Sequence, residues 1–135
     1  MDIFRGLSDR NLDRIAGLCE EASFGAGGYL GKQNEAGTHV HIIRKGEFTV
    51  TTGSGESSIV VRSVGPYETL HLAVLFEPPI LVTTAHAATD GEAWVIPRVR
   101  LMELCELEPS IGMHIYQAAC AIVIRRYRHT LDRLG

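Results

Sequence analysis

Residues 40–50 read VHIIRKGEFTV, and this stretch carries the strongest indication of fold in the chain. It divides at Gly46 into two short runs typical of β-strands, and Val40 and Ile42 form an apolar stripe on one face of the first run. A tight turn between two strands favours a glycine with positive φ, because no Cβ obstructs that conformation. The stretch therefore predicts a β-hairpin with Gly46 in its turn.

Similar short runs extend from residue 22 to residue 97. They cover residues 38–44, 47–52, 58–64, 80–87 and 93–96, and the second and third are separated by the turn sequence Gly53-Ser54-Gly55. Many short strands joined by glycine-rich turns are typical of a sandwich or barrel. We therefore predict a barrel over residues 22–97.

Helical patterns flank this region on both sides. Ser8 is a favourable N-cap for a helix over residues 8–19, in which apolar residues recur at helical spacing. After Pro97 we expect C-terminal helices over residues 98–134, a short one and then a long one with Pro109 in its first turn. The predicted fold class is mainly β with flanking helices, in a single domain over residues 1–135.

The composition is that of an ordinary globular domain. The 135 residues are 45% hydrophobic and 21% charged, with a formal net charge of −3. A weakly acidic chain lacks the clustered cations that a free-standing nucleic-acid-binding protein needs. No apolar run is long enough to span a membrane, no signal peptide core is evident, and the three cysteines form no CxxC pair. These features predict a cytoplasmic protein with no membrane partner.

The centre of the last predicted helix, Ala118–Ile124, is apolar all round. A helix on the surface of a monomer keeps one polar face, so two sides of this helix must be covered. The barrel would cover one side, and a second copy of the chain is predicted to cover the other; the N-terminal helix is the alternative cover. The predicted dimer interface comprises Ile115, Ala119, Ile122, Val123 and Arg126.

Several motifs, in this order, resemble those of the cyclic nucleotide-binding domain family. The opening residues 4–8 are similar to "F-x-x-L-S", residues 24–30 to "f-x-x-G-x-x-l", and residues 40–50 to "l-y-i-I-x-x-G-x-v-x-v". Residues 64–66 and 108–111 are similar to the turn before the phosphate cassette and to the "P-x-l" start of the last helix. The family includes the sensor halves of catabolite-activator-like and fumarate-nitrate-regulator-like transcription factors. The resemblance implies a double-stranded β-helix jelly-roll barrel as the fold. It also implies signal transduction and transcription regulation, with nucleic acid as a partner only where a DNA-binding domain follows in a longer protein.

The resemblance also implies a phosphate site, which this sequence lacks. In the family, a Gly-Glu pair at a short helix N-terminus and a following arginine hold the phosphate and ribose of the nucleotide. Here His71 and Leu72 stand in place of the pair, and Leu81 or its neighbours in place of the arginine. No Arg or Lys occurs from residue 63 to residue 96. Burying a phosphate without a cation costs several kcal/mol, so the usual mode of nucleotide binding is not expected.

A pocket is nevertheless expected at this place, with an apolar lining and a few polar points. Its predicted residues are Leu70, His71, Leu72, Leu81, Val82, Thr83 and Thr84. The principal hypothesis is a non-catalytic regulatory or sensor domain without a cofactor, whose barrel serves another small ligand or oligomerisation. One alternative is binding of cAMP or cGMP through an atypical anion site that uses Arg62, Arg125 or Arg126. Another, implied by related sensors, is haem ligated by His71.

A metal-dependent cupin enzyme is the alternative from a different class. His39 and His41 alternate on one strand, Glu47 follows, and His71 comes later, as in the ligand set of a cupin. Such ligands suit a transition metal. Glu47 comes late for the usual spacing, however, and the inward stripe formed by Val40 and Ile42 predicts that both histidines point outward. No nucleophile–base pair stands out, so no enzyme activity is predicted.

Overall fold

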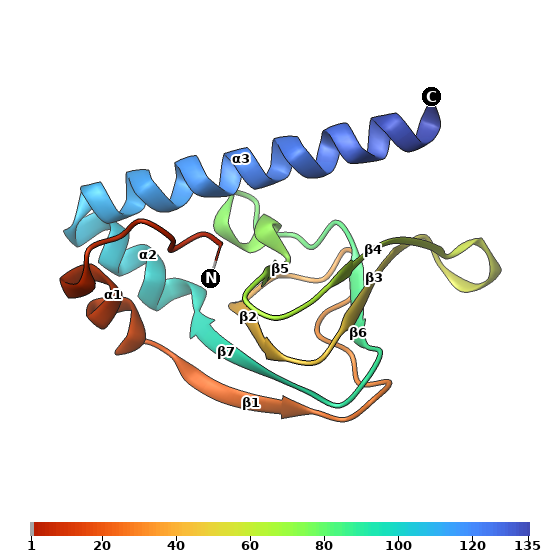
Figure 1. Ribbon diagram of the computed structural model, residues 1–135, viewed down its shortest axis with the longest axis horizontal. Helices are drawn as coiled ribbons and strands as arrows, with labels where there is room; N and C mark the ends of the chain where they lie inside the picture. The colour runs from red at the N-terminus through yellow and green to blue at the C-terminus, as the bar shows by residue number, and fades with distance from the viewer. Residues whose placement is uncertain (1) are drawn as a thin grey trace.

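The computed structural model describes residues 2–135, and along the chain the strands follow one N-terminal helix and precede two C-terminal helices (Figure 1). The helices are α1 (Asp9–Ala16), α2 (Arg98–Leu107) and α3 (Pro109–Leu134). The strands are β1 (Glu20–Phe24), β2 (His39–Lys45), β3 (Phe48–Thr52), β4 (Ile59–Val64), β5 (Thr69–Leu70), β6 (Thr84–Ala87) and β7 (Gly91–Pro97), with 3-10 turns η1 (Gly55–Ser57) and η2 (Leu72–Leu75). The predicted mainly β class with flanking helices is confirmed.

The strands form two antiparallel sheets. One has the order β1-β7-β2-β5 and the other the order β4-β3-β6. Outside these strands, single bridges join Tyr29 to His86 and Ala36 to Ile80. Hydrogen bonding is therefore not continuous around the strands of the described residues, and the predicted barrel is corrected to an open arrangement of two sheets that resembles a jelly roll.

Strand β2 contributes to two separate hydrophobic cores. Val40 and Ile42 belong to a core that they share with the helices and η2, and both are almost fully buried. Ile43 belongs to a second core between the sheets, together with Phe48 of β3 and Ala93 of β7. Because successive side chains of a strand point to opposite faces, one strand can serve both cores.

Two element boundaries differ from the sequence prediction. The N-cap at Ser8 is confirmed, since the backbone N–H of Asn11 donates to its Oγ at 3.2 Å. The helix ends at Ala16 and not at residue 19, because the chain must extend at Glu20 to pair with Val95 of β7. The predicted strand over residues 80–87 is formed only at β6, and residues 80–83 are loop.

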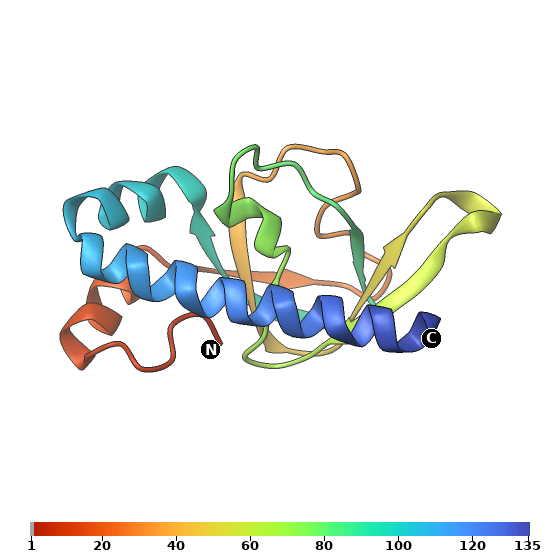
Figure 2. The ribbon, with the colours of Figure 1, turned by 90° about the horizontal axis from the view of Figure 1, so that it is seen from above.

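Helix α3 runs along the length of the molecule, past α2 at one end and past η2 and the β3–β4 hairpin towards the other (Figures 1 and 2). Ile111, Ile115 and Ala119 are fully buried in the helix-side core, and Ile122 is nearly so. Arg133 near its end donates to the carbonyl of Val61 at 2.8 Å. No helix of the described residues is long and apolar enough to cross a membrane.

This packing changes the set of α3 residues that a second copy could contact. Ile115, Ala119 and Ile122 of the predicted interface are buried within the chain's own core. Arg126 is partly buried and donates from Nη2 to the carbonyl of Thr69 at 2.9 Å. Val123 is 41% exposed and stays available. The predicted stripe therefore faces the sheet side, and the exposed apolar stripe lies beside it on the helix.

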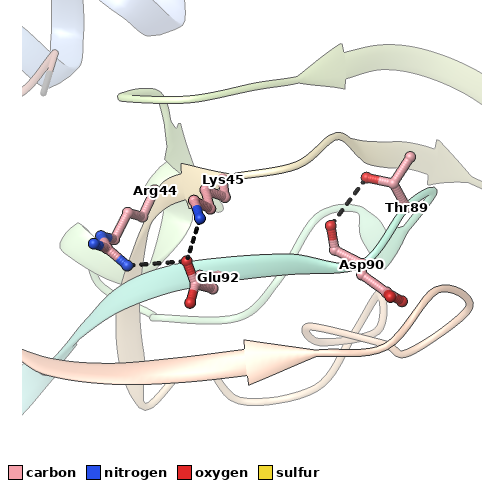
Figure 3. Close-up of polar contacts among 5 residues, drawn as sticks. All are labelled: Arg44, Lys45, Thr89, Asp90 and Glu92. Atoms are coloured by element: carbon pink, nitrogen blue, oxygen red, sulfur yellow. Dashed lines mark hydrogen bonds and ion pairs between the residues drawn. The ribbon is translucent and has the colours of Figure 1, made fainter.

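The β2–β3 turn lies against the β6–β7 turn, and a group of polar contacts joins the strands there (Figure 3). Oε2 of Glu92 is 2.9 Å from Nη1 of Arg44 and 3.9 Å from Nζ of Lys45. The hydroxyl of Thr89 donates to the carbonyl of Asp90 at 3.2 Å. The Thr89 hydroxyl also accepts from the backbone N–H of Glu47 at 3.2 Å, and this bond joins the two turns beside Gly46.

Gly46 has a φ of +91°, as the hairpin prediction requires. A Cβ at this position would lie 2.7 Å from the carbonyl oxygen of Asp90 and 2.9 Å from Cα of Gly91. Both atoms belong to backbone and have little freedom to move. A Cβ on Gly55, which has a φ of +55°, would meet no atom within 4 Å.

We expect Gly46→Ala to lower the free energy of unfolding by about 2–4 kcal/mol, because left-handed strain adds to a backbone overlap. Gly55→Ala is the matched control, and we expect it to lower that free energy by about 1 kcal/mol, since φ near +55° is accessible to alanine. Urea unfolding followed by circular dichroism measures both values. Equal losses for the two variants would contradict the role of the turn-to-turn contact.

Candidate functional site

A pocket of about 580 Å³ lies between the sheets, η2 and helix α3. Its walls come from β3 and β4, from η2 with the loop that follows it, and from α3. Most of the lining side chains are apolar, including Val50, Leu70, Phe76, Val123 and Tyr127. Pockets of this size and apolar character are typical of small-molecule sites.

The structure brings five of the seven predicted pocket residues to this cavity: Leu70, His71, Leu72, Val82 and Thr83. Leu81 is instead buried in the helix-side core. Its side chain packs next to Gly31, and its backbone N–H donates to the carbonyl of Glu35. Thr84 begins β6, and its hydroxyl accepts from the backbone N–H of Gln33 at 2.9 Å. Neither Leu81 nor Thr84 therefore lines the cavity.

His71 holds the start of η2 in position. It has a φ of +53°, a conformation that a glycine adopts readily and that suits the family's glycine at this place. Its imidazole is buried, and Nε2 lies 2.6 Å from the carbonyl oxygen of Leu30. Burial lowers the pKa of His71, so the neutral ring donates from Nε2 to that carbonyl. This nitrogen is therefore engaged and not free to ligate haem iron.

Two arginines from outside the cassette line the pocket. Arg62 lies on β4 opposite Val50 of β3, and residues directly opposite on paired strands share one face of the sheet. Val64, two residues further on, is on that same inward face. Arg126 enters from α3. Arg125, the other helix arginine considered from the sequence, is exposed and not in the lining.

Sequence reasoning missed the α3 wall of the pocket. Cys120, Ile124, Tyr127 and Thr130 line it, and Val123, which was assigned to a dimer interface, does so too. Their spacing of three or four residues places them on one stripe of the helix. The helical spacing of these residues can be seen in the sequence, but the segments of the fold that they face cannot. The loop residues Phe76, Pro78 and Ile80 were also missed, because a strand was predicted over part of that segment.

The histidines of the cupin alternative do not gather into a metal site. Within residues 2–135, no group of three His, Cys, Asp or Glu side chains is placed to hold a metal ion. His39 is exposed, as predicted. For His41 the outward prediction is wrong: its ring is 6.3 Å from that of Phe24, and its Nδ1 is buried without a hydrogen-bond partner among these residues.

The two-sheet fold with a pocket beneath the last helix is the arrangement of a regulatory domain of the cyclic nucleotide-binding type. A family model described as the cyclic nucleotide-binding domain matches residues 21–108. The chain belongs to this family. No curated protein matches the sequence.

Solved structures share this fold over nearly the whole chain. A Geobacter metallireducens protein, provisionally assigned as cyclic nucleotide-binding, is 25% identical with a TM-score of 0.80, covering 93% of this chain and 91% of its own. The catabolite activator protein of Thermus thermophilus is 21% identical with a TM-score of 0.82 over 99% of this chain and 63% of its own length. The N-terminal domain of a transcriptional regulator from Streptomyces coelicolor is 20% identical, with a TM-score of 0.77 over 100% of this chain and 92% of its own.

The environment of His41 predicts a loss of stability in mild acid. Burial, and then the charges of His71 and His39, lower the pKa of His41 from 6.5 to about 4. In the unfolded chain the imidazole titrates near 6.5, so between these two values the unfolded state binds more protons. Stability is therefore present above pH 6.5 and declines as the pH falls towards 4, by about 3 kcal/mol in total.

We expect His41→Phe to reduce this dependence, with the part that remains arising from the buried His71, while His129→Phe, at an exposed position on α3, leaves it unchanged. Chemical unfolding at a series of pH values between 4 and 7 measures the slope for each protein. A wild-type slope that persists in His41→Phe would show that other groups cause it.

Proposed function

We propose that this chain is a non-catalytic regulatory domain that senses a small molecule in the pocket beneath α3, without the phosphate contacts usual in its family. The observation that carries the proposal is the pocket itself. It has the place and size of a ligand site, yet its wall at η2 and the following loop is apolar. The family and the neighbouring regulators support a sensing role.

The cassette residues offer a nucleotide little to bind. Leu72 is 4% exposed and packs into the helix-side core, where the family's carboxylate would receive a ribose hydroxyl. From residue 63 to residue 96 there is no Arg or Lys to pair with a phosphate. A ribose and a phosphate held at the cassette, as in the family, would lose their hydration against leucine and proline side chains, and unpaired polar groups are expensive to bury. The two arginines of the pocket belong to β4 and α3 and not to the cassette.

We expect no binding of cAMP or cGMP in the micromolar range by isothermal titration calorimetry with the whole chain. The reason is the missing carboxylate and the missing cassette cation, each of which forms strong charge-assisted hydrogen bonds. Micromolar affinity for either nucleotide would contradict the proposal and favour an atypical anion site instead.

We also propose that the chain forms a homodimer through the exposed stripe of α3. Met113, Cys120, Tyr127 and Leu134 follow one another at intervals of seven residues, and all four are exposed. Leu131 adds to this stripe and is 46% exposed. A seven-residue apolar repeat is typical of a helix that packs along a second helix as a coiled coil. Tyr127 belongs both to the stripe and to the pocket wall, so ligand and dimer would be in contact.

We expect the wild-type chain to have twice its own mass of 14.8 kDa by sedimentation equilibrium, and Leu131→Asp to shift the equilibrium towards the monomer by at least about tenfold. Ala121→Asp introduces the same charge at an exposed position outside the stripe and serves as the control. Helical circular dichroism confirms that each variant is folded. A wild type that is monomeric at high concentration, or equal effects of the two variants, would contradict the proposed interface.

A further inference from the structure

The charges that line the pocket are of one sign. Among the described residues, Arg62 and Arg126 are the charged side chains of the lining, and no carboxylate lines it. They belong to β4 and α3, and Arg126 reaches the start of the cassette, where it donates to the carbonyl of Thr69 shortly before His71. The rest of the lining is largely apolar, with Thr83 and Thr130 as hydroxyl groups and His71 as a buried ring. A cavity of this kind attracts a negative group to the place where the two arginines lie.

The nearby carboxylates are engaged elsewhere. Asp2 accepts hydrogen bonds from the backbone N–H of Ile3 at 2.7 Å and of Thr69 at 3.0 Å, and also from the Thr69 hydroxyl. Glu68 accepts from the backbone N–H of Gly65 at 3.2 Å. Within residues 2–135, neither carboxylate forms an ion pair within 4.0 Å of Arg62 or Arg126.

Both guanidinium groups keep hydrogen-bond donors free. In Arg126, Nη2 donates to the carbonyl of Thr69 at 2.9 Å, which orients the group and uses one of its five N–H bonds. The side chain of Arg62 forms no hydrogen bond with the described residues. A guanidinium presents its donors in a planar fork that matches the two oxygens of a carboxylate.

The two positive charges destabilise one another in this half-buried place. Burial, and then the charge of Arg62, lower the pKa of Arg126, although the nearby carboxylates of Asp2 and Glu68 act in the opposite direction. Burial likewise lowers the pKa of Arg62, although Glu68 acts in the opposite direction. Because arginine does not lose its proton near neutral pH, the pocket stays positively charged. A bound anion would neutralise that charge, and its binding would be favoured for that reason.

We propose that Arg62 and Arg126 form an anion-recognition pair, and that the pocket accepts an amphipathic organic acid with one carboxylate on an apolar body. The carboxylate would contact the two guanidinium groups at the β4–α3 wall. The apolar body would lie along Leu70, Leu72, Phe76 and Val82 towards the loop. The inference rests on the proposed sensing function and adds the chemical class of the ligand.

Three probes of one chain length test this inference: octanoate, 1-octanol and octylammonium, each titrated calorimetrically into the whole chain. We expect octanoate to bind more tightly than octanol and octylammonium to bind least. Arg62→Met should weaken octanoate binding by roughly tenfold to a hundredfold, as for loss of a hydrogen-bonded charge. It should leave octanol binding unchanged, and Arg126→Met should act in the same way.

Arg125→Met is the matched control, because Arg125 is exposed on the same helix and does not line the pocket. Arg62→Met loses no hydrogen bond between described residues and is expected to fold, which thermal unfolding verifies. Equal affinities for octanoate and octanol, or an effect of Arg125→Met as large as that of Arg62→Met, would overturn the anion pair while the sensing function stands. Failure of all three probes to bind would overturn both the inference and the proposed ligand pocket.

Discussion

Burial of strand β2 on both faces is the constraint on which the rest of the structure depends. Val40 and Ile42 point into the core shared with the helices, and Ile43 points into the core between the sheets. Hydrophobic burial is the main favourable term in folding, so a strand that serves two cores fixes the helices relative to the sheets. β5 pairs with β2 at His41 and Ile42, which brings η2 and its pocket wall to the same place. The place of the pocket in the fold is thus set by β2 and its pairing with β5, and not by the residues that line the pocket.

Helix α3 is held by the same core, and the side chains outside its buried stripe remain available for other contacts. The stripe with Ile111, Ile115 and Ala119 is fully buried and sets the rotation of the helix about its axis. With that rotation fixed, the neighbouring stripe with Val123 and Tyr127 lies over the pocket. Any molecule that fills the pocket must therefore touch the helix. In a domain whose partners bind along this helix, occupancy of the pocket would be linked to assembly by mutual stabilisation.

The sequence predicted the β-rich fold, the Gly46 turn, the Ser8 cap and the full extent of α3, because each depends on short-range pattern and turn chemistry. It did not predict that residues 80–83 would be loop, since β-branched residues favour a strand wherever tertiary pairing permits it. It could not predict that Leu81 would turn away from the cavity, and it offered Arg62 in the cavity only as an alternative, with no means of choosing it over Arg125. The side on which a residue lies follows from strand register, and register is set by pairing with distant segments.

The position of the cations distinguishes this pocket from one built around a phosphate cassette. The segment formed by η2 and the following loop contributes leucine, proline and phenylalanine, whereas β4 and α3 contribute Arg62 and Arg126. The cavity therefore carries positive charge, and this charge comes from elements other than the cassette. A ligand anchored through its anion at β4 and α3 would place its apolar part against η2. Because Arg126 also bonds to Thr69 on β5, an anion bound to the pair would act on the strand, the helix and the cavity at once.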